Sequence, residues 1–285
     1  MSVRGKREMF VDSKLSQKIE RAEGMANAAF VDSSQRIDPE VGACRVEIAG
    51  TMAMFDGVRS PCTQTFGLGL FDNVGEREIG EIEAFFRDRG SDVFHEVSPL
   101  ADAGLLSLLG ERGYRAIEHS MVLYKELDAF DSGVGSNANI STRIIRPGET
   151  DVWVRTLANG WSTESEGLGE FMLGFGSVSA QCEGGLPWLA EIEGRPVAAA
   201  MLFVFDGLAV LAGASTIFEA RGRGAQNALL SARLTYASKV GCTLAAMATA
   251  PGSQSQKNSQ KNGFQIAYTR TKWHLGLERS ATHLL

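Results

Sequence analysis

The sequence has few of the residues that build metal and redox sites. Its four cysteines are scattered without a C-x-x-C pair, and its four histidines share no metal-ligand spacing. We therefore expect no metal ion, and we expect free thiols in a reducing cytoplasm. A G-x-S-x-G nucleophile elbow is also absent, although a triad around one of the histidines stays open.

The chain also lacks a basic excess and an apolar leader. Its net charge is −6, which argues against nucleic acid as a partner and is compatible with a cationic substrate. The first residues contain no apolar segment of the signal-peptide kind. The longest apolar stretch, residues 196–214, is interrupted by Asp206 and Gly207, a strong hairpin signal. Two strands explain this stretch better than a membrane helix, so we expect no membrane partner.

Length and composition predict two domains. A chain of 285 residues is long enough for two, and residues 127–140 are rich in Gly, Ser, Asn and Asp, as a linker is. We therefore divide the chain into domains 1–126 and 141–278, with a tail at 279–285. In the second half, apolar periodicity and turn residues predict the order β-α-α-β-β-β-α-β-α-β-β. This order indicates an α/β fold with a mixed, mostly antiparallel sheet flanked by helices.

The end of the first half repeats the order found at the end of the second. Residues 79–126 and 226–277 both run helix, glycine, strand, proline, helix, glycine, aromatic residue and strands, with Gly113 aligned to Gly263. Two copies fit like domains in tandem better than a solenoid. We interpret the repeat as an old duplication.

Residues 220–224 carry the clearest chemical signal. Two glycines allow a tight turn before a predicted helix over 225–239, whose first N–H groups have no helical partner. Arg221 and Arg223 add cationic donors, and a pyrophosphate suits such a helix start. The segment is not a dinucleotide fingerprint, because Asn227 stands where the third glycine belongs, and it lacks the Gly-Lys-Ser/Thr of a P-loop.

The same segment resembles the coenzyme signature of the GNAT superfamily of acyl-CoA-dependent N-acetyltransferases. The family pattern Q/R-x-x-G-x-G/A matches at Arg221 and Gly224, but the chain departs from it at Gln226, which stands in the last Gly/Ala position. A short helix followed by Gly263-Phe264 matches a second family feature. The resemblance implies two tandem GNAT-like domains, the first degenerate because it has no R-x-x-G-x-G. It also implies acetyl-CoA as co-substrate, bound by Ser215, Thr216, Ile217, Arg221, Gly222, Arg223, Gly224, Ala225, Gln226, Ser255 and Asn258.

The resemblance further implies direct transfer of an acetyl or other short acyl group to a small-molecule amine in a ternary complex. The pantetheine arm would lie between strands at about 211–216 and 243–249, where a backbone N–H would polarise the thioester carbonyl. The alternative is a non-catalytic acyl-CoA-binding regulatory module. A homodimer stays open.

The catalytic acid and base are less clearly marked. Many members of the family carry a tyrosine acid where this chain has Ser259, so Ser259 and the nearby Tyr268 are the candidates for the acid. Glu191 is our candidate for the base, beside Glu193 and Glu219, because all three lie near the expected cleft in the sequence.

Overall fold

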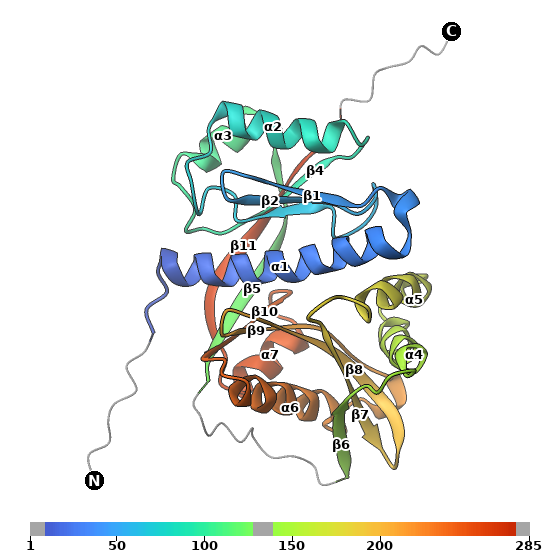
Figure 1. Ribbon diagram of the computed structural model, residues 1–285. Helices are drawn as coiled ribbons and strands as arrows, with labels where there is room; N and C mark the ends of the chain where they lie inside the picture. The colour runs from blue at the N-terminus through green and yellow to red at the C-terminus, as the bar shows by residue number, and fades with distance from the viewer. Residues whose placement is uncertain (1–8, 128–138, 278–285) are drawn as a thin grey trace, which may run out of the picture.

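Eleven strands of the computed structural model, which describes residues 9–127 and 139–277, form one continuous mixed sheet (Figure 1). Their order across the sheet is β1-β2-β3-β4-β11-β5-β10-β9-β8-β7-β6. Most of the predicted linker 127–140 and all of the predicted tail 279–285 lie outside the described residues. The strands are β1 (Cys44–Ile48), β2 (Thr51–Phe55), β3 (Gln64–Phe66), β4 (Val93–Val97), β5 (Arg115–Glu126), β6 (Ile140–Ile144), β7 (Leu186–Ile192), β8 (Arg195–Phe205), β9 (Leu208–Thr216), β10 (Leu244–Thr249) and β11 (Gln265–Leu275).

Seven α-helices in the described part of the chain pack on this sheet. Three of them, α1, α4 and α5, share one apolar core, while α6 packs on a second core, and α2 and α3 cover a third. The predicted α/β fold with helices flanking a mixed sheet is therefore confirmed. The helices are α1 (Ser13–Ile37), α2 (Glu76–Arg87), α3 (Leu105–Glu111), α4 (Thr150–Trp161), α5 (Leu168–Ser179), α6 (Ala225–Lys239) and α7 (Gln254–Lys261), with 3-10 turns η1 (Pro39–Val41) and η2 (Phe218–Ala220).

The last strand of each half pairs with a strand of the other half. Strand β11 lies between β4 and β5, and β5 lies between β11 and β10, with antiparallel pairing throughout. The two expected sheets are thus joined into one by exchanged final strands. Strand β11 is also a single long strand, whereas we expected a pair. Its residues 265–275 include no Gly, Pro, Asn or Asp that would form a turn, and a bulge near Ala267 only shifts its register.

Tight turns join the strands of the C-terminal half. Glu193-Gly194 connects β7 to β8, and Asp206-Gly207 connects β8 to β9. All four residues have positive φ, between 46° and 73°, as two-residue hairpins of this kind require. The apolar stretch 196–214 is therefore a hairpin, as predicted. None of the helices in residues 9–127 and 139–277 combines the length and apolarity that crossing a bilayer requires.

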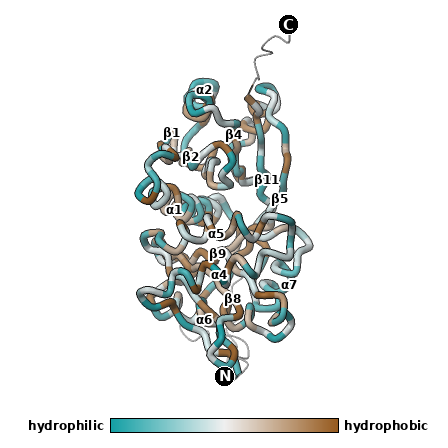
Figure 2. The backbone as a smooth tube through the Cα atoms, turned by 90° about the vertical axis from the view of Figure 1, so that its right-hand side faces the viewer, coloured by the Kyte–Doolittle hydropathy of each residue, from teal (hydrophilic) through white to brown (hydrophobic). Residues whose placement is uncertain are grey.

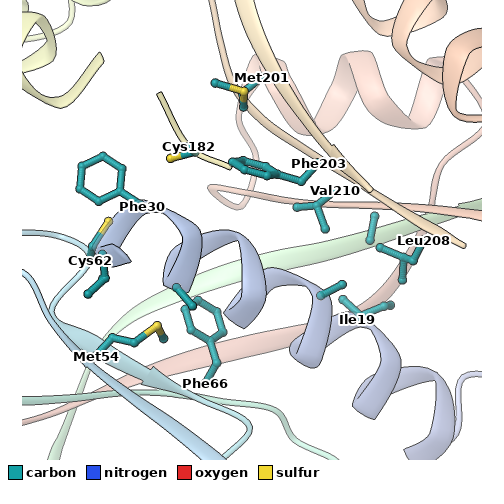
Figure 3. Close-up of a cluster of buried hydrophobic side chains, with 14 of the residues drawn as sticks. Ile19, Phe30, Met54, Cys62, Phe66, Cys182, Met201, Phe203, Leu208 and Val210 are labelled. Carbon is teal, nitrogen blue, oxygen red and sulfur yellow. The ribbon is translucent and has the colours of Figure 1, made fainter. Parts of the chain in front are cut away.

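Helix α1 lies between the two halves and packs against both (Figures 1 and 2). Asp12 caps it by accepting a hydrogen bond from the Leu15 backbone N–H at 2.9 Å. Figure 3 shows Leu208 and Val210 of the C-terminal half on one side of α1, and Met54 and Phe66 of the N-terminal half on the other. Both faces of α1 are therefore buried, and the two halves share one apolar core.

Candidate functional site

Strands β9 and β10 run parallel for three residues and then separate. Their pairing extends from Leu208–Leu244 to Val210–Ala246 and goes no further. A cavity of about 830 Å³ opens between the diverging arms. It is bounded by β9, β10, the start of α6, the start of α7 and the end of α4. The gap lies where the sequence predicted one.

Strand β9 carries a bulge inside this gap. Between the pairs Ala199–Ser215 and Met201–Ala212, β9 has one residue more than β8. One of the residues in the bulge is Gly213, whose φ of +58° favours glycine. A bulge takes backbone groups out of the ladder. Backbone N–H and C=O groups of β9 are thus free of strand pairing beside the cavity.

A glycine bend at the mouth of the cavity leads from η2 into α6. Gly222 and Gly224 have φ values of +75° and +95°, which residues with a Cβ rarely adopt. Gly224 is the N-cap of α6, and no side chain caps the first turn. The first N–H groups of α6 therefore stay available, at the end of the helix where the dipole is positive. An anion is the natural ligand of such a helix start.

The cavity brings together most of the residues that the sequence predicted for the coenzyme. Ile217 and Arg223 are not among its lining residues. On the α7 side, Asn258 donates from Nδ2 to Oε1 of Gln226 at 3.1 Å, which links α7 to the start of α6. The nine that line the cavity are Ser215, Thr216, Arg221, Gly222, Gly224, Ala225, Gln226, Ser255 and Asn258.

Arg221 ties the glycine bend to the loop after α4. Its Nη2 donates to the carbonyl of Gly160 at 2.9 Å, to Oγ1 of Thr163 at 2.8 Å and to Oε1 of Glu164 at 3.1 Å. The side chains of Arg221 and Glu164 are 38% and 52% exposed, so this ion pair is weak. In this state the guanidinium of Arg221 closes one side of the mouth.

Three buried polar atoms of the lining have no hydrogen-bond partner in the described structure. They are Oγ1 of Thr216, Oγ1 of Thr249 and Nε1 of Trp161. They come from both diverging strands and from α4. A buried polar group without a partner is costly, and such groups are rare in folded proteins. The three atoms belong to residues that line the cavity, but each lies buried beneath its surface.

The two candidates for the acid do not line the cavity. Tyr268 is buried in β11, where its hydroxyl donates to Oε1 of Glu20 at 2.8 Å. Burial raises the pKa of Tyr268 well above its usual value. Ser259 is buried in α7, and its hydroxyl donates to the carbonyl of Ser255 at 2.8 Å. Ser259 therefore lies behind the cavity wall, and Tyr268 is engaged elsewhere.

The candidates for the base also lie outside the lining. Glu191 is paired with Arg143, with Oε1 and Nη2 2.7 Å apart. Glu193 is exposed in the β7–β8 turn, and Glu219 is exposed in η2. Among the lining residues that the structure describes, Glu164 is the only carboxylate.

Arg233 is a lining residue that our sequence reasoning missed. It is only 2% exposed. Nε donates to the carbonyl of Leu229 at 3.2 Å, and Nη1 donates to the carbonyls of Met201 at 2.8 Å and Ala212 at 3.4 Å. A signal was available in the sequence, because Arg233 lies four residues after Leu229 and directly before Leu234, on the apolar side of a helix.

Several solved structures to which this chain is similar in fold are described as acetyltransferases. A GCN5-related N-acetyltransferase from Kribbella flavida superposes with a TM-score of 0.64 at 16% identity, over 91% of this chain and 95% of that chain. A GCN5-related N-acetyltransferase from Sphaerobacter thermophilus superposes with a TM-score of 0.52 at 17% identity, over 74% of this chain and 71% of that chain. A tandem GNAT protein from the clavulanic acid biosynthesis pathway superposes with a TM-score of 0.56 at 14% identity, over 79% of this chain and 78% of that chain.

Sequence comparison adds nothing to this likeness. No protein-family model and no curated protein matches the chain. The structural likeness nevertheless extends through both halves, since the Kribbella flavida protein covers nine-tenths of the chain. The architecture and the structural matches together give the chain the GNAT fold in its tandem arrangement.

Proposed function

We propose that residues 141–278 form an N-acyltransferase domain that binds acyl-CoA, and that residues 1–126 form a degenerate copy. The observation that carries this proposal is the uncapped start of α6 at the mouth of a gap between diverging parallel strands. The first feature suits a pyrophosphate, and the second suits an extended arm that pairs with a strand edge. The acetyltransferases that share the fold support the same reading.

The residues present fit acyl-CoA as the substrate. The backbone N–H groups at Gly224, Ala225 and Gln226 would receive the pyrophosphate. Backbone groups of the β9 bulge lie on one arm, where a pantetheine chain with two amide groups would offer them partners. The apolar lining between the arms suits the methylene groups of the same chain.

The reaction we propose is direct aminolysis of the thioester. The amine nitrogen bonds to the carbonyl carbon, the carbon–sulfur bond breaks, and the thiolate leaves with the electron pair. The amine loses one proton, and the thiolate takes up one. A backbone N–H freed by the β9 bulge would stabilise the oxyanion. Glu164 is the carboxylate among the described lining residues and would attract a cationic amine to the cavity.

Binding of coenzyme A tests this proposal through Gly224→Glu. The new carboxylate would repel the pyrophosphate and obstruct the start of α6, so calorimetry should show affinity lowered roughly tenfold to a hundredfold. Gly194→Glu is the matched control, because Gly194 also has a positive φ and an added Cβ would meet no neighbouring atom within 4 Å, but Gly194 lies in the β7–β8 turn. Equal affinity in the two variants would contradict the site assignment.

The second candidate function is that of an acyl-CoA-binding module without catalysis. The occupied hydroxyls of Ser259 and Tyr268 favour it, because neither is placed to protonate a leaving thiolate. Release of free thiol from acetyl-CoA, malonyl-CoA and succinyl-CoA, measured over a panel of small amines, separates the two. Amine-dependent release supports the transferase, whereas tight binding of coenzyme A without release for any amine supports the module.

A further inference from the structure

Arg233 is a fully buried cation without a counter-ion. It makes no ion pair with any described carboxylate, and its hydrogen bonds from Nε and Nη1 go to three backbone carbonyls. Burial lowers the pKa of Arg233 to about 9, so its guanidinium still carries its charge at neutral pH. A buried charge is normally paired, because removing it from water is costly.

One end of this guanidinium has no protein partner. Arginine has five N–H donors, and the carbonyls that Arg233 reaches account only for Nε and Nη1. Nη2 has no acceptor among the described residues. A role limited to holding the β9 bulge explains the bonds to Met201 and Ala212 but leaves Nη2 unexplained.

Arg233 lies at the narrow end of the cavity. Its Nη1 bonds to the carbonyl of Ala212, two residues beyond Val210, the last residue of β9 that pairs with β10. Leu211 and Met247, the next residues of the two arms, also line the cavity and are apolar. The narrow end therefore offers one charged group among apolar side chains.

We propose that the acyl group accepted by this cavity ends in a carboxylate, and that Nη2 of Arg233 binds that carboxylate. The inference rests on the proposed function, because it names the class of acyl donor: the half-thioester of a short dicarboxylic acid. With the pyrophosphate at the mouth, the acyl end of the substrate points toward the narrow end. A bound carboxylate there supplies the missing counter-ion and accepts the free N–H groups.

Equilibrium binding without an acceptor amine tests the inference. Malonyl-CoA and acetoacetyl-CoA have acyl groups of nearly the same shape, but only malonyl-CoA carries the terminal carboxylate. We expect the unaltered protein to bind malonyl-CoA roughly tenfold or more tightly than acetoacetyl-CoA, in calorimetry at low salt and pH 7. Succinyl-CoA serves as the longer probe. A ratio near one, with no preference for succinyl-CoA either, overturns the inference without the need for any variant.

Arg233→Met supplies the second arm of the test. It should bring the malonyl to acetoacetyl ratio close to one while coenzyme A itself still binds. The exposed Arg155 of α4 gives the matched control, because Arg155→Met changes the net charge equally and should leave the ratio unchanged. A preference that survives in Arg233→Met places the carboxylate elsewhere and overturns the inference. If Arg233→Met does not fold, Arg233→Gln, which keeps a donor for the carbonyls, takes its place.

The two proposals fail in different ways. If coenzyme A and all its thioesters fail to bind, the proposed function itself is wrong. If coenzyme A binds and the carboxylate makes no difference, only the assignment to Arg233 is wrong.

Discussion

Replacement of Glu20 by Gln tests how α1 is held between the two halves. Glu20 is fully buried and accepts hydrogen bonds from the Tyr268 hydroxyl at 2.8 Å and from Nη1 of Arg270 at 3.2 Å. Glu23 of α1 and Glu96 of β4 also pair with Arg270. Three buried carboxylates therefore face one buried guanidinium. The ammonium group of Lys272 is a second cation in the cluster and pairs with Glu96. The negative charge exceeds the positive charge in this cluster.

The excess has a consequence for the pH dependence of stability. Burial, only partly offset by Arg270, raises the pKa of Glu20 from its ordinary 4.5 to about 7. A carboxyl whose folded pKa is raised binds its proton more tightly in the folded state, so its contribution to stability is largest at low pH. That contribution is lost as pH rises from about 4.5 to 7. At about 1.4 kcal/mol per pKa unit, the loss is about 3 kcal/mol.

Urea unfolding of the unaltered protein and Glu20→Gln at several pH values between 4.5 and 8 measures this loss. The amide stays neutral and can still accept from Tyr268, so Glu20→Gln should gain about 3 kcal/mol relative to the unaltered protein across this range. Taking the difference between the two proteins cancels other titrating groups. A difference that does not change with pH would refute the reasoning that Glu20 takes up a proton on folding.

Two further changes probe the arm of β9 and the buried core of the N-terminal half. Gly160→Ala should lower the free energy of unfolding by about 1–3 kcal/mol and weaken coenzyme A binding, because a Cβ there would lie 2.6 Å from Cβ of Ser215 and 2.9 Å from the Thr216 nitrogen. Thermal unfolding and calorimetry measure the two effects. Gly174→Ala is the control, because an added Cβ there would meet no neighbouring atom within 4 Å. His95→Gln should move acid unfolding to lower pH in a circular-dichroism titration. Burial lowers the pKa of His95 to about 3, so the unfolded chain binds protons more tightly and stability falls as pH drops from 6.5 toward 3; an unchanged acid midpoint would contradict this.

The local elements of the C-terminal half could be predicted from the sequence because their signals are local. The helix predicted over 225–239 coincides with α6, and the strand expected at about 211–216 lies within β9. Asp206-Gly207 and Gly224 have the positive φ values that their positions implied. In each case the structure depends on residues within one turn of the chain, so the pattern is sufficient.

The exchange of β5 and β11 could not be predicted in this way. Both strands follow a short helix and a glycine, and either copy could have kept its own strand at no cost visible in the sequence. Pairing partners depend on contacts distant in the chain. The clearest of these is Arg270 of β11, whose carboxylate partners Glu20 and Glu23 lie nearly 250 residues earlier. The sequence of a strand does not predict which distant helix carries the partners of its charged residues.

The sequence located the backbone features of the candidate site, but it did not indicate where the side chains of its catalytic candidates lie. Glycine and helix-start signals located the bend at Gly222 and Gly224, and the gap between β9 and β10 followed from the family resemblance. Ser259 was a candidate because it occupies the position of the family tyrosine, whereas Tyr268 and Glu191 were chosen by closeness in sequence. Tyr268 instead bonds to Glu20 of α1, and Glu191 pairs with Arg143. Arg233 was overlooked because a single arginine in a helix is normally taken to be exposed.

The exchanged strands give the N-terminal copy a part in the candidate site even though it lacks the glycine bend. Strand β10 pairs with β9 over three residues but with β5 over six. Within those six, Met121 of β5 pairs with Thr249, and Val122 of β5 pairs with Ala248. Thr249 and Ala248 line the cavity. Without β5, the arm of β10 that diverges from β9 would be an unpaired sheet edge with nothing to hold its direction. The N-terminal half therefore contributes to the candidate site through β5, which holds the direction of the diverging arm of β10.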